Sequence, residues 1–283
     1  MSFELVKKYS EKVDEQFATE SKLSLLTNSD YDFTGAHSVV IYSISTAPMN
    51  DYSRNRFDDF DESEASLSRF GAIRDLASQT QEALLTRDRS FVFNIDKLDQ
   101  DETAQALQEA TALARQIREQ AIPEIDGYAY GKMWAGAGKK AEPAALTAEN
   151  IYDFITAGTE VMDDNEVPED GRCIIVTPGT YRLMKKSSDI AMDCDVSADQ
   201  RLLGVVAMVD GLTVIKVPAS RLPENFGFMI CHPSATCAPT KLEDYGVHRD
   251  TALSSGTIIT GRLVYDCFVL KNKAAGIYAH PIA

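Results

Sequence analysis

Cysteine and histidine form one cluster of metal-ligand residue types in this chain of 283 residues: Cys231-His232, followed after four residues by Cys237. Thiolate and imidazole are ligands that zinc prefers, and a structural zinc site takes four of them. No second pair stands at zinc-site spacing elsewhere in the sequence. We therefore expect no metal, and we interpret Cys231 as a buried thiol that ends a strand before a polar loop.

A Cys–His nucleophile would be the enzymatic use of the same residues. Such a thiol needs an imidazole within hydrogen-bonding distance, but adjacent residues of a strand point to opposite faces of the sheet. His232 is therefore badly placed to activate Cys231, and His248 or His280 could serve only through an unknown fold. We expect no catalytic residue and no cofactor.

Two further patterns superficially resemble ligand sites. The acidic run at 58–64 offers oxygen ligands but lacks the glycine and the spaced terminal glutamate of a calcium loop. Gly136 and Gly138 neither follow a predicted strand nor open a predicted helix, whereas the glycines of a phosphate-binding loop do both. The lack of a catalytic constellation favours a role other than catalysis.

The composition is that of an acidic globular protein, with 44% hydrophobic and 25% charged residues and a formal net charge of −15. Because phosphate affinity depends on neutralising cations, this charge disfavours broad nucleic-acid binding and adsorption to anionic membranes. No secretory signal and no membrane-spanning apolar run are expected. Five scattered cysteines indicate reduced thiols in a protein made in the cytoplasm.

The sequence of the first third of the chain has few apolar residues that could form a hydrophobic core. Residues 1–33 are polar with sparse apolar anchors and are expected to form an arm. Residues 38–47 and 83–95 are rich in β-branched residues and predict strands. The charged stretch from Pro48 to Glu82 is long for a connection inside a compact domain. These patterns predict a hairpin arm that leaves the body of the protein.

The remaining sequence predicts a long helix and an α/β unit. The helix is expected from about Asp101 to 135–138, with a kink near Pro123, which lacks a backbone donor. Residues 146–237 follow as a compact unit of helices and short strands, with a hairpin turn at Asp210-Gly211. Further strands are expected over 257–278.

The order of these elements, together with several sequence phrases, resembles the major capsid proteins of tailed bacteriophages, which have the Hong Kong-type shell fold. The resemblance covers nearly the whole chain. The phrases that carry it are YDFTGAHSVVIYSISTAPMNDYSR at 31–54, LLTRDRSFVFNID at 84–96, IPEIDGY at 122–128, VPEDGRCIIVTPGTYRLMKK at 167–186 and VDGLTVIKVP at 209–218.

The resemblance implies an α+β fold with an assignment for each segment. The implied parts are an N-terminal arm at 1–33, an extended β-hairpin loop over a neighbouring subunit at 34–97, a peripheral domain with a long spine helix at 98–145, an α/β axial domain at 146–237, and returning strands of the peripheral domain at 238–283.

A structural function is also implied, with no active site. The chain would assemble as pentamers and hexamers into the icosahedral head shell that encloses double-stranded phage DNA, without sequence-specific DNA binding and without a membrane. A separate scaffolding protein and a portal would be its partners, with assembly in the cytoplasm of the host bacterium and a final place in the virion. Because residues 23–96 contain no lysine, the isopeptide crosslink of some family members is not expected.

Charged residues of the extended loop are the candidates for contacts between subunits. Arginines in this otherwise acidic stretch could bind carboxylates at the start of a neighbour's spine helix through paired hydrogen bonds. The candidate contact residues are Arg54, Arg56, Arg69, Arg74, Asp101, Glu102 and Glu109.

Two alternatives stay open at this point. One is the shell protein of an encapsulin-like nanocompartment, which would share the fold but enclose protein. The other is a monomeric cytoplasmic enzyme that uses Cys231 with His232 or His248.

Overall fold

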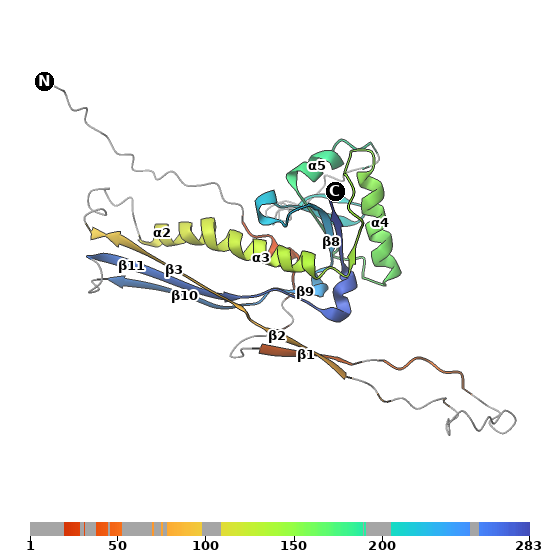
Figure 1. The fold of residues 1–283 in the computed structure, drawn as a ribbon, viewed down its shortest axis with the longest axis horizontal. Coiled ribbons are helices and arrows are strands. Elements are labelled where there is room, and N and C mark those ends of the chain that lie inside the picture. The colour runs from red at the N-terminus through yellow and green to blue at the C-terminus, as the bar shows by residue number, and fades with distance from the viewer. Residues whose placement is uncertain are drawn as a thin grey trace. The chain divides into compact units, whose positions relative to one another are not determined.

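The computed structural model of the chain describes residues 20–28, 31, 38–44, 46–52, 70, 75, 78–97, 109–188, 190, 205–249 and 255–283. Contacts divide the chain into two compact units. The smaller unit comprises residues 38–83, and the larger unit comprises 1–37 together with 84–283. The larger unit contains a long helix, a three-stranded sheet and a six-stranded sheet (Figure 1).

A continuous helical run from Glu109 to Ala135 is the main helix of the larger unit. It consists of α2 (Glu109–Gln116), a π-helical turn (Ile117–Ala121) and α3 (Ile122–Ala135). The start expected near Asp101 lies outside the described residues.

Proline and glycine shape this helix. Pro123 has no N–H, and in an α-helix its ring would meet the carbonyl of Glu119. The π-helical turn just before α3 is wider than an α-helical turn and relieves that contact, so the kink expected near Pro123 takes this form. The helix ends where predicted, at Gly136, whose N–H donates to the carbonyl of Lys132 at 2.9 Å.

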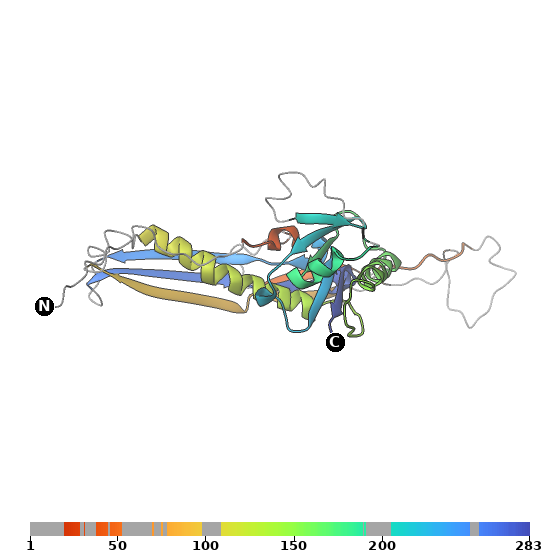
Figure 2. The same ribbon diagram turned by 90° about the horizontal axis from the view of Figure 1, so that it is seen from above.

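Three antiparallel strands, β3 (Arg87–Asp96), β10 (Thr240–Arg249) and β11 (Gly256–Tyr265), form a sheet in the order β10-β11-β3. The long helix runs along this sheet (Figure 2). Ile95 on β3 and Ile259 and Leu263 on β11 are buried on one face of the sheet. Val92 on β3, which points to the opposite face, is 68% exposed. The sheet therefore has one covered face and one open face.

The strand predicted over 83–95 is two strands in the structure. β2 (Ser78–Leu84) pairs with β1 (Ser38–Ile44) in a two-stranded sheet, while β3 pairs with β11. The break falls at Thr86 because its backbone N–H donates to a carboxylate oxygen of Asp266 at 2.9 Å instead of to a neighbouring strand. The hairpin expected from the sequence is therefore formed by β1 with β2 and does not include β3.

The six-stranded sheet has the order β4-β13-β8-β5-β7-β6. Its strands are β4 (Lys139–Lys140), β5 (Cys173–Val176), β6 (Val205–Val209), β7 (Leu212–Lys216), β8 (Phe226–Cys231) and β13 (Ile277–Pro281). The turn between β6 and β7 is the predicted one, with φ of 49° at Asp210 and 73° at Gly211. The last strand, β13, joins this sheet beside β8.

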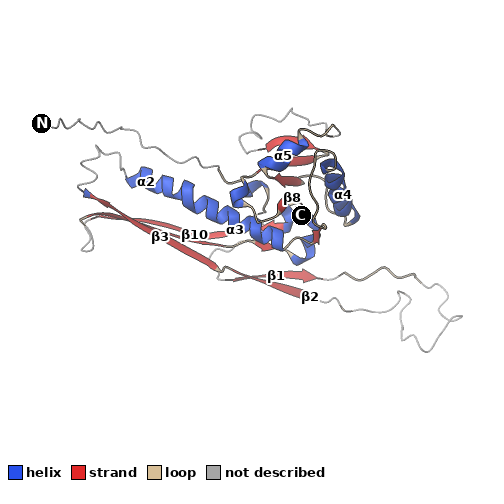
Figure 3. Ribbon diagram, turned by 45° about the horizontal axis from the view of Figure 1, so that its top comes forward, coloured by secondary structure: helices blue, strands red, loops and turns tan. Residues whose placement is uncertain are grey.

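Both faces of the six-stranded sheet are buried. One face packs on α4 (Ile151–Asp164) and α5 (Pro178–Met184), which lie beside the strands in Figure 3. Thr177 caps α5 as its Oγ1 accepts from the N–H of Thr180. The other face packs on Tyr130 and Met133 of α3. The sheet is thus a middle layer between helices.

Short elements complete the larger unit. β9 (Thr236–Cys237) pairs with β12 (Phe268–Val269). Single 3-10 turns are formed by Leu23–Leu25, Ala219–Arg221, Pro233–Ala235 and Lys271–Gly276.

The described part of the N-terminal segment, residues 20–28, is built into the core. Leu26 is fully buried against the same face of the sheet as α3. Asn28 donates from its backbone to the carbonyl of Thr236 at 2.9 Å and from its side chain to that of Ser234 at 3.0 Å. These described residues therefore contact the core of the larger unit, and the partners of Asn28 are more than 200 positions away in sequence.

Two glycines inside helices test the packing of the layers. Gly131→Ala in α3 should stabilise the chain by about 0.5–1 kcal/mol because alanine is the better helix former and an added Cβ has no neighbour within 4 Å. Gly158→Ala in α4 has the same helical gain, but its Cβ would lie 2.8 Å from Ile230 and 2.9 Å from the Tyr278 ring. We expect net destabilisation of the second variant in urea unfolding. Equal stabilisation of both would contradict the packing of α4 on the sheet.

Candidate functional site

Asp266 follows β11 and binds Thr86, two residues after the point where the chain re-enters the larger unit at Leu84. Both its carboxylate oxygens are bonded: Oδ2 accepts from the N–H and the hydroxyl of Thr86 at 2.9 and 2.7 Å, and Oδ1 accepts from the Tyr128 hydroxyl at 2.9 Å and the Cys267 N–H at 2.7 Å. One buried carboxylate thus joins residue 86, the long helix and the end of β11.

The electrostatics of Asp266 follow from these contacts. Burial by itself would raise its pKa, but the hydrogen bonds from Thr86, Cys267 and Tyr128 outweigh burial and leave the pKa below the usual value. The ionised carboxylate is therefore the form that the fold stabilises, and it fixes the path of the chain at the root of the smaller unit.

A second buried acid, Asp126, joins three parts of the larger unit. Its Oδ2 accepts from Arg221 at 2.8 Å and its Oδ1 from the hydroxyl of Ser21 at 2.6 Å. Asp126 belongs to α3, Arg221 follows β7, and Ser21 belongs to the N-terminal segment. Burial raises the pKa of Asp126, while the hydrogen bonds from Ser21 and Arg221 oppose that rise. The pair is nearly inaccessible, with side chains 7% and 2% exposed.

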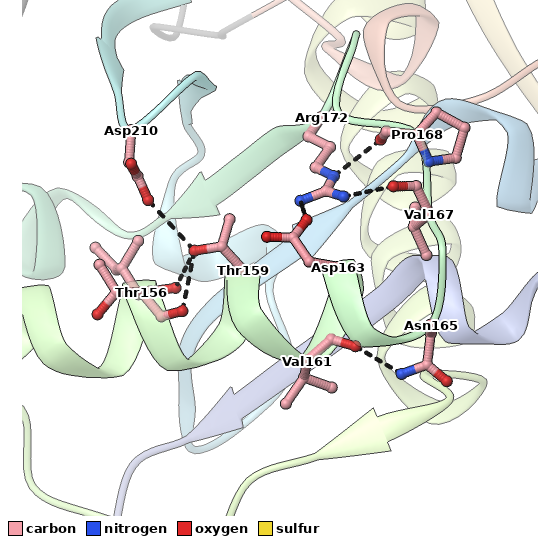
Figure 4. A network of polar contacts seen from close by, with 10 residues as sticks. Thr156, Thr159, Val161, Asp163, Asn165, Val167, Pro168, Arg172 and Asp210 are labelled. Carbon is pink, nitrogen blue, oxygen red and sulfur yellow. Dashed lines mark hydrogen bonds and ion pairs between the residues drawn. The ribbon is translucent and has the colours of Figure 1, made fainter.

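The loop after α4 is held by another arginine, Arg172 (Figure 4). It forms an ion pair with Asp163 at 2.7 Å and donates to the carbonyls of Val167 and Pro168. On the same helix, the Thr159 hydroxyl lies 3.4 Å from the carboxylate of Asp210 in the β6–β7 turn. These contacts orient the loop after α4 and the β6–β7 turn.

The smaller unit carries large apolar side chains on its surface. Five of its described large apolar residues are exposed, with Met49 at 98% and Phe70 at 75%, and the others are Val40, Tyr42 and Tyr52. The Tyr52 and Phe70 rings meet edge to face at 5.1 Å, and the Asn50 side chain donates to the carbonyl of Phe70 at 3.1 Å. Such an apolar surface is typical of a segment that is covered by another molecule.

The residues considered for chemistry are separated in the structure. Cys231 is fully buried, and burial raises its pKa well above the usual value. The His232 ring lies 2.7 Å from the Ser234 hydroxyl and 3.0 Å from the Asp170 carbonyl. His248 contacts Thr260, and His280 stacks between two phenylalanine rings. Among the described residues, no group of three or more acidic, cysteine or histidine residues could hold a metal ion.

The predicted contact residues cannot be placed. Arg54, Arg56, Arg69, Arg74, Asp101 and Glu102 lie outside the described residues, as does the side chain of Glu109. The buried acids Asp126 and Asp266 were not singled out from the sequence. Their only local signal is an acid inside an apolar stretch, IPEIDGY for the first and LVYDCFV for the second.

Comparison with solved structures identifies the arrangement. The chain superposes on a chain of Mycobacterium phage Che8 with a TM-score of 0.70 and 18% identity, covering 98% of this chain and 96% of that one. For the capsid of cyanophage P-SCSP1u the values are 0.73 and 13%, covering 98% and 93%. For the mature capsid of bacteriophage PhiM1 they are 0.72 and 14%, covering 99% and 92%.

The chain has the phage capsid fold. The likeness lies in the arrangement of elements, since no protein-family model matches the sequence and a search of curated proteins gives no match. The α+β class and the long helix predicted from the sequence are confirmed at this level. Among the described residues of this phage capsid fold, no helix is long and apolar enough to cross a membrane.

The contribution of the buried Asp126–Arg221 pair to stability can be tested by removing one charge. Arg221→Met leaves Asp126 buried without its cation and should cost about 3–5 kcal/mol in urea unfolding. Adding Asp126→Leu should recover much of that loss because no buried charge then remains. As a control, Arg89→Met breaks the exposed pair with Glu124 on the same helix and should change stability little. Equal effects of the two single variants would contradict the burial of Asp126.

The lowered pKa of Asp266 predicts that the stability of the chain depends on pH in the acid range. Because its folded pKa is lowered, its stabilising effect is complete above the unfolded value of about 3.9 and is lost as the pH falls through the folded pKa. Asp266→Asn should therefore be less stable than the parent at pH 6, and the difference should shrink towards pH 2. Glu142→Gln, at an exposed acid, is the control and should follow the parent. A difference that does not depend on pH would contradict the assignment.

Proposed function

We propose that the chain is a major capsid protein that assembles as pentamers and hexamers into the icosahedral head shell of a tailed phage around double-stranded DNA. The observation that carries this proposal is the superposition of 98–99% of the chain on capsid chains of phages. A match over nearly the full length of both chains includes the parts by which such chains would contact one another.

Two properties of the chain support the proposal. The smaller unit exposes apolar side chains, which is costly in water and is relieved when a second copy covers them. The net charge of −15 would keep packaged DNA from adhering to a container wall. Neither property is needed by a monomeric enzyme, and the geometry around Cys231 and His232 does not support one.

The same proposal assigns roles to segments. Residues 1–33 would be the N-terminal arm, 34–97 the extended loop, 98–145 and 238–283 the peripheral domain, and 146–237 the axial domain. We also propose a separate scaffolding protein and a portal as partners, with assembly in the host cytoplasm before incorporation into the virion.

Particle size tests the proposed function. The purified chain, alone and with the scaffolding protein of its gene neighbourhood, is analysed by light scattering and electron microscopy. We expect pentamers, hexamers or closed particles far above the 31.1 kDa of one chain. A chain that stays monomeric in both samples would contradict the proposal. Particles filled with a cargo enzyme and free of DNA in the native cell would instead indicate a nanocompartment.

We further propose that loop arginines hold the extended loop on a neighbouring subunit, at acids near Asp101, Glu102 and Glu109. The test replaces Arg54, Arg56, Arg69 and Arg74 by glutamine. Shell yield should fall, and the parent's shells should loosen between 0.1 M and 1 M salt, over which the screening length drops from about 10 to about 3 Å. Arg182→Gln, at an exposed arginine of α5, is the control. Unchanged yield and unchanged salt tolerance of the fourfold variant would show that apolar and backbone contacts hold the loop.

A further inference from the structure

Two cysteines face each other across neighbouring strands of the six-stranded sheet. In the antiparallel pairing of β5 with β8, Cys173 lies directly opposite Cys231. Directly opposite residues have Cα atoms about 4.5–5.5 Å apart. This is within the range of about 4.4–6.8 Å that a disulfide needs.

The two thiols also share one face of the sheet. Cys173 and Cys231 both pack in the cluster that contains Leu26 and Tyr130, whereas their neighbours Ile174 and Ile230 pack in the cluster on the opposite face. Side chains of opposite residues on one face meet as a pair. The strand register is therefore compatible with a disulfide between them.

We propose that Cys173 and Cys231 are an oxidation site, at which a peroxide converts two thiols into a disulfide within one chain once the protein leaves a reducing compartment. In the first step, the Cys173 sulfur takes one oxygen of hydrogen peroxide to form a sulfenic acid, and hydroxide leaves and is protonated to water. In the second, the Cys231 sulfur attacks Cys173, the sulfur–oxygen bond breaks and a second water leaves. Two thiols and one hydrogen peroxide thus give one disulfide and two waters.

The order of attack follows from burial. Cys173 is 5% exposed and Cys231 is not exposed at all, so peroxide reaches Cys173 first. Burial raises the pKa of Cys173 to about 11, so little thiolate is present at neutral pH. The reaction is consequently slow at pH 7, and its rate rises about tenfold for each pH unit below that pKa.

A nearby second pair provides an internal comparison. Cys237 and Cys267 are both buried and near each other, but Cys237 is opposite Phe268 in the β9–β12 pairing. Cys267 precedes Phe268 in the chain, so the strand register does not set it directly opposite Cys237. This pair should stay reduced under conditions that oxidise the first pair. The proposal rests on the strand register alone and does not depend on the proposed function.

The test uses the purified full-length chain treated with hydrogen peroxide at pH 8 and digested with trypsin without reductant. Mass spectrometry should find peptide 173–182 linked to peptide 222–241, with the loss of two hydrogens. Because peptide 222–241 holds both Cys231 and Cys237, two variants assign the bond. Cys237→Ser should keep the link, and Cys231→Ser should abolish it. The linked chain should unfold at a temperature roughly 5 °C higher than the reduced chain.

Three results would overturn the proposal. The first is that both thiols of the parent remain free, or become sulfinic acids, after full reaction with peroxide. The second is loss of the link in Cys237→Ser, which would place the bond at Cys237. The third is a rate of linkage that does not change between pH 7 and pH 8. The parent and Cys237→Ser decide the question even if Cys231→Ser does not fold.

Discussion

The six-stranded sheet must be covered on both faces, and this requirement organises the larger unit. Helices α4 and α5 cover one face, and α3 with residues 20–28 covers the other. Because α3 continues through a π-helical turn into α2, which runs along the three-stranded sheet, one helical run connects the two sheets. The buried ion pair between Asp126 and Arg221 lies within this apolar contact, where a mispaired arrangement would leave a charge unpaired. The pair therefore makes the position of α3 specific.

The smaller unit is organised by a different constraint. Its β1–β2 pair is a two-stranded sheet, which is marginally stable by itself in water. Five of its large apolar side chains are exposed, whereas the larger unit packs apolar residues on both sides of a sheet. The bonds of Asp266 to Thr86 fix the chain just after this unit. Under the proposed function, a second copy of the chain would cover these exposed side chains.

Features with a local signal are predictable from the sequence. The turn at Asp210-Gly211 and the end of the helix at Gly136 each depend on a few adjacent residues. Features that depend on a distant partner are not. The break at Thr86 depends on Asp266, 180 positions later, and the docking of residues 20–28 depends on Asp126 and Ser234. A single sequence carries no sign of such pairings. The fold class came from the order of the elements and from resemblance, while no periodic pattern indicated the buried acids.

Hydrogen exchange measures the central claim, that the larger unit is complete in one chain while the smaller unit requires a second copy. Backbone amides of peptides from 38–83 and from β8 would be followed in unassembled chains and in assembled particles. We expect the β8 amides to exchange slowly in both samples, because that strand is buried in the centre of its sheet. Amides of 38–83 should exchange quickly in unassembled chains and slowly in particles. Slow exchange of 38–83 in unassembled chains would contradict the claim.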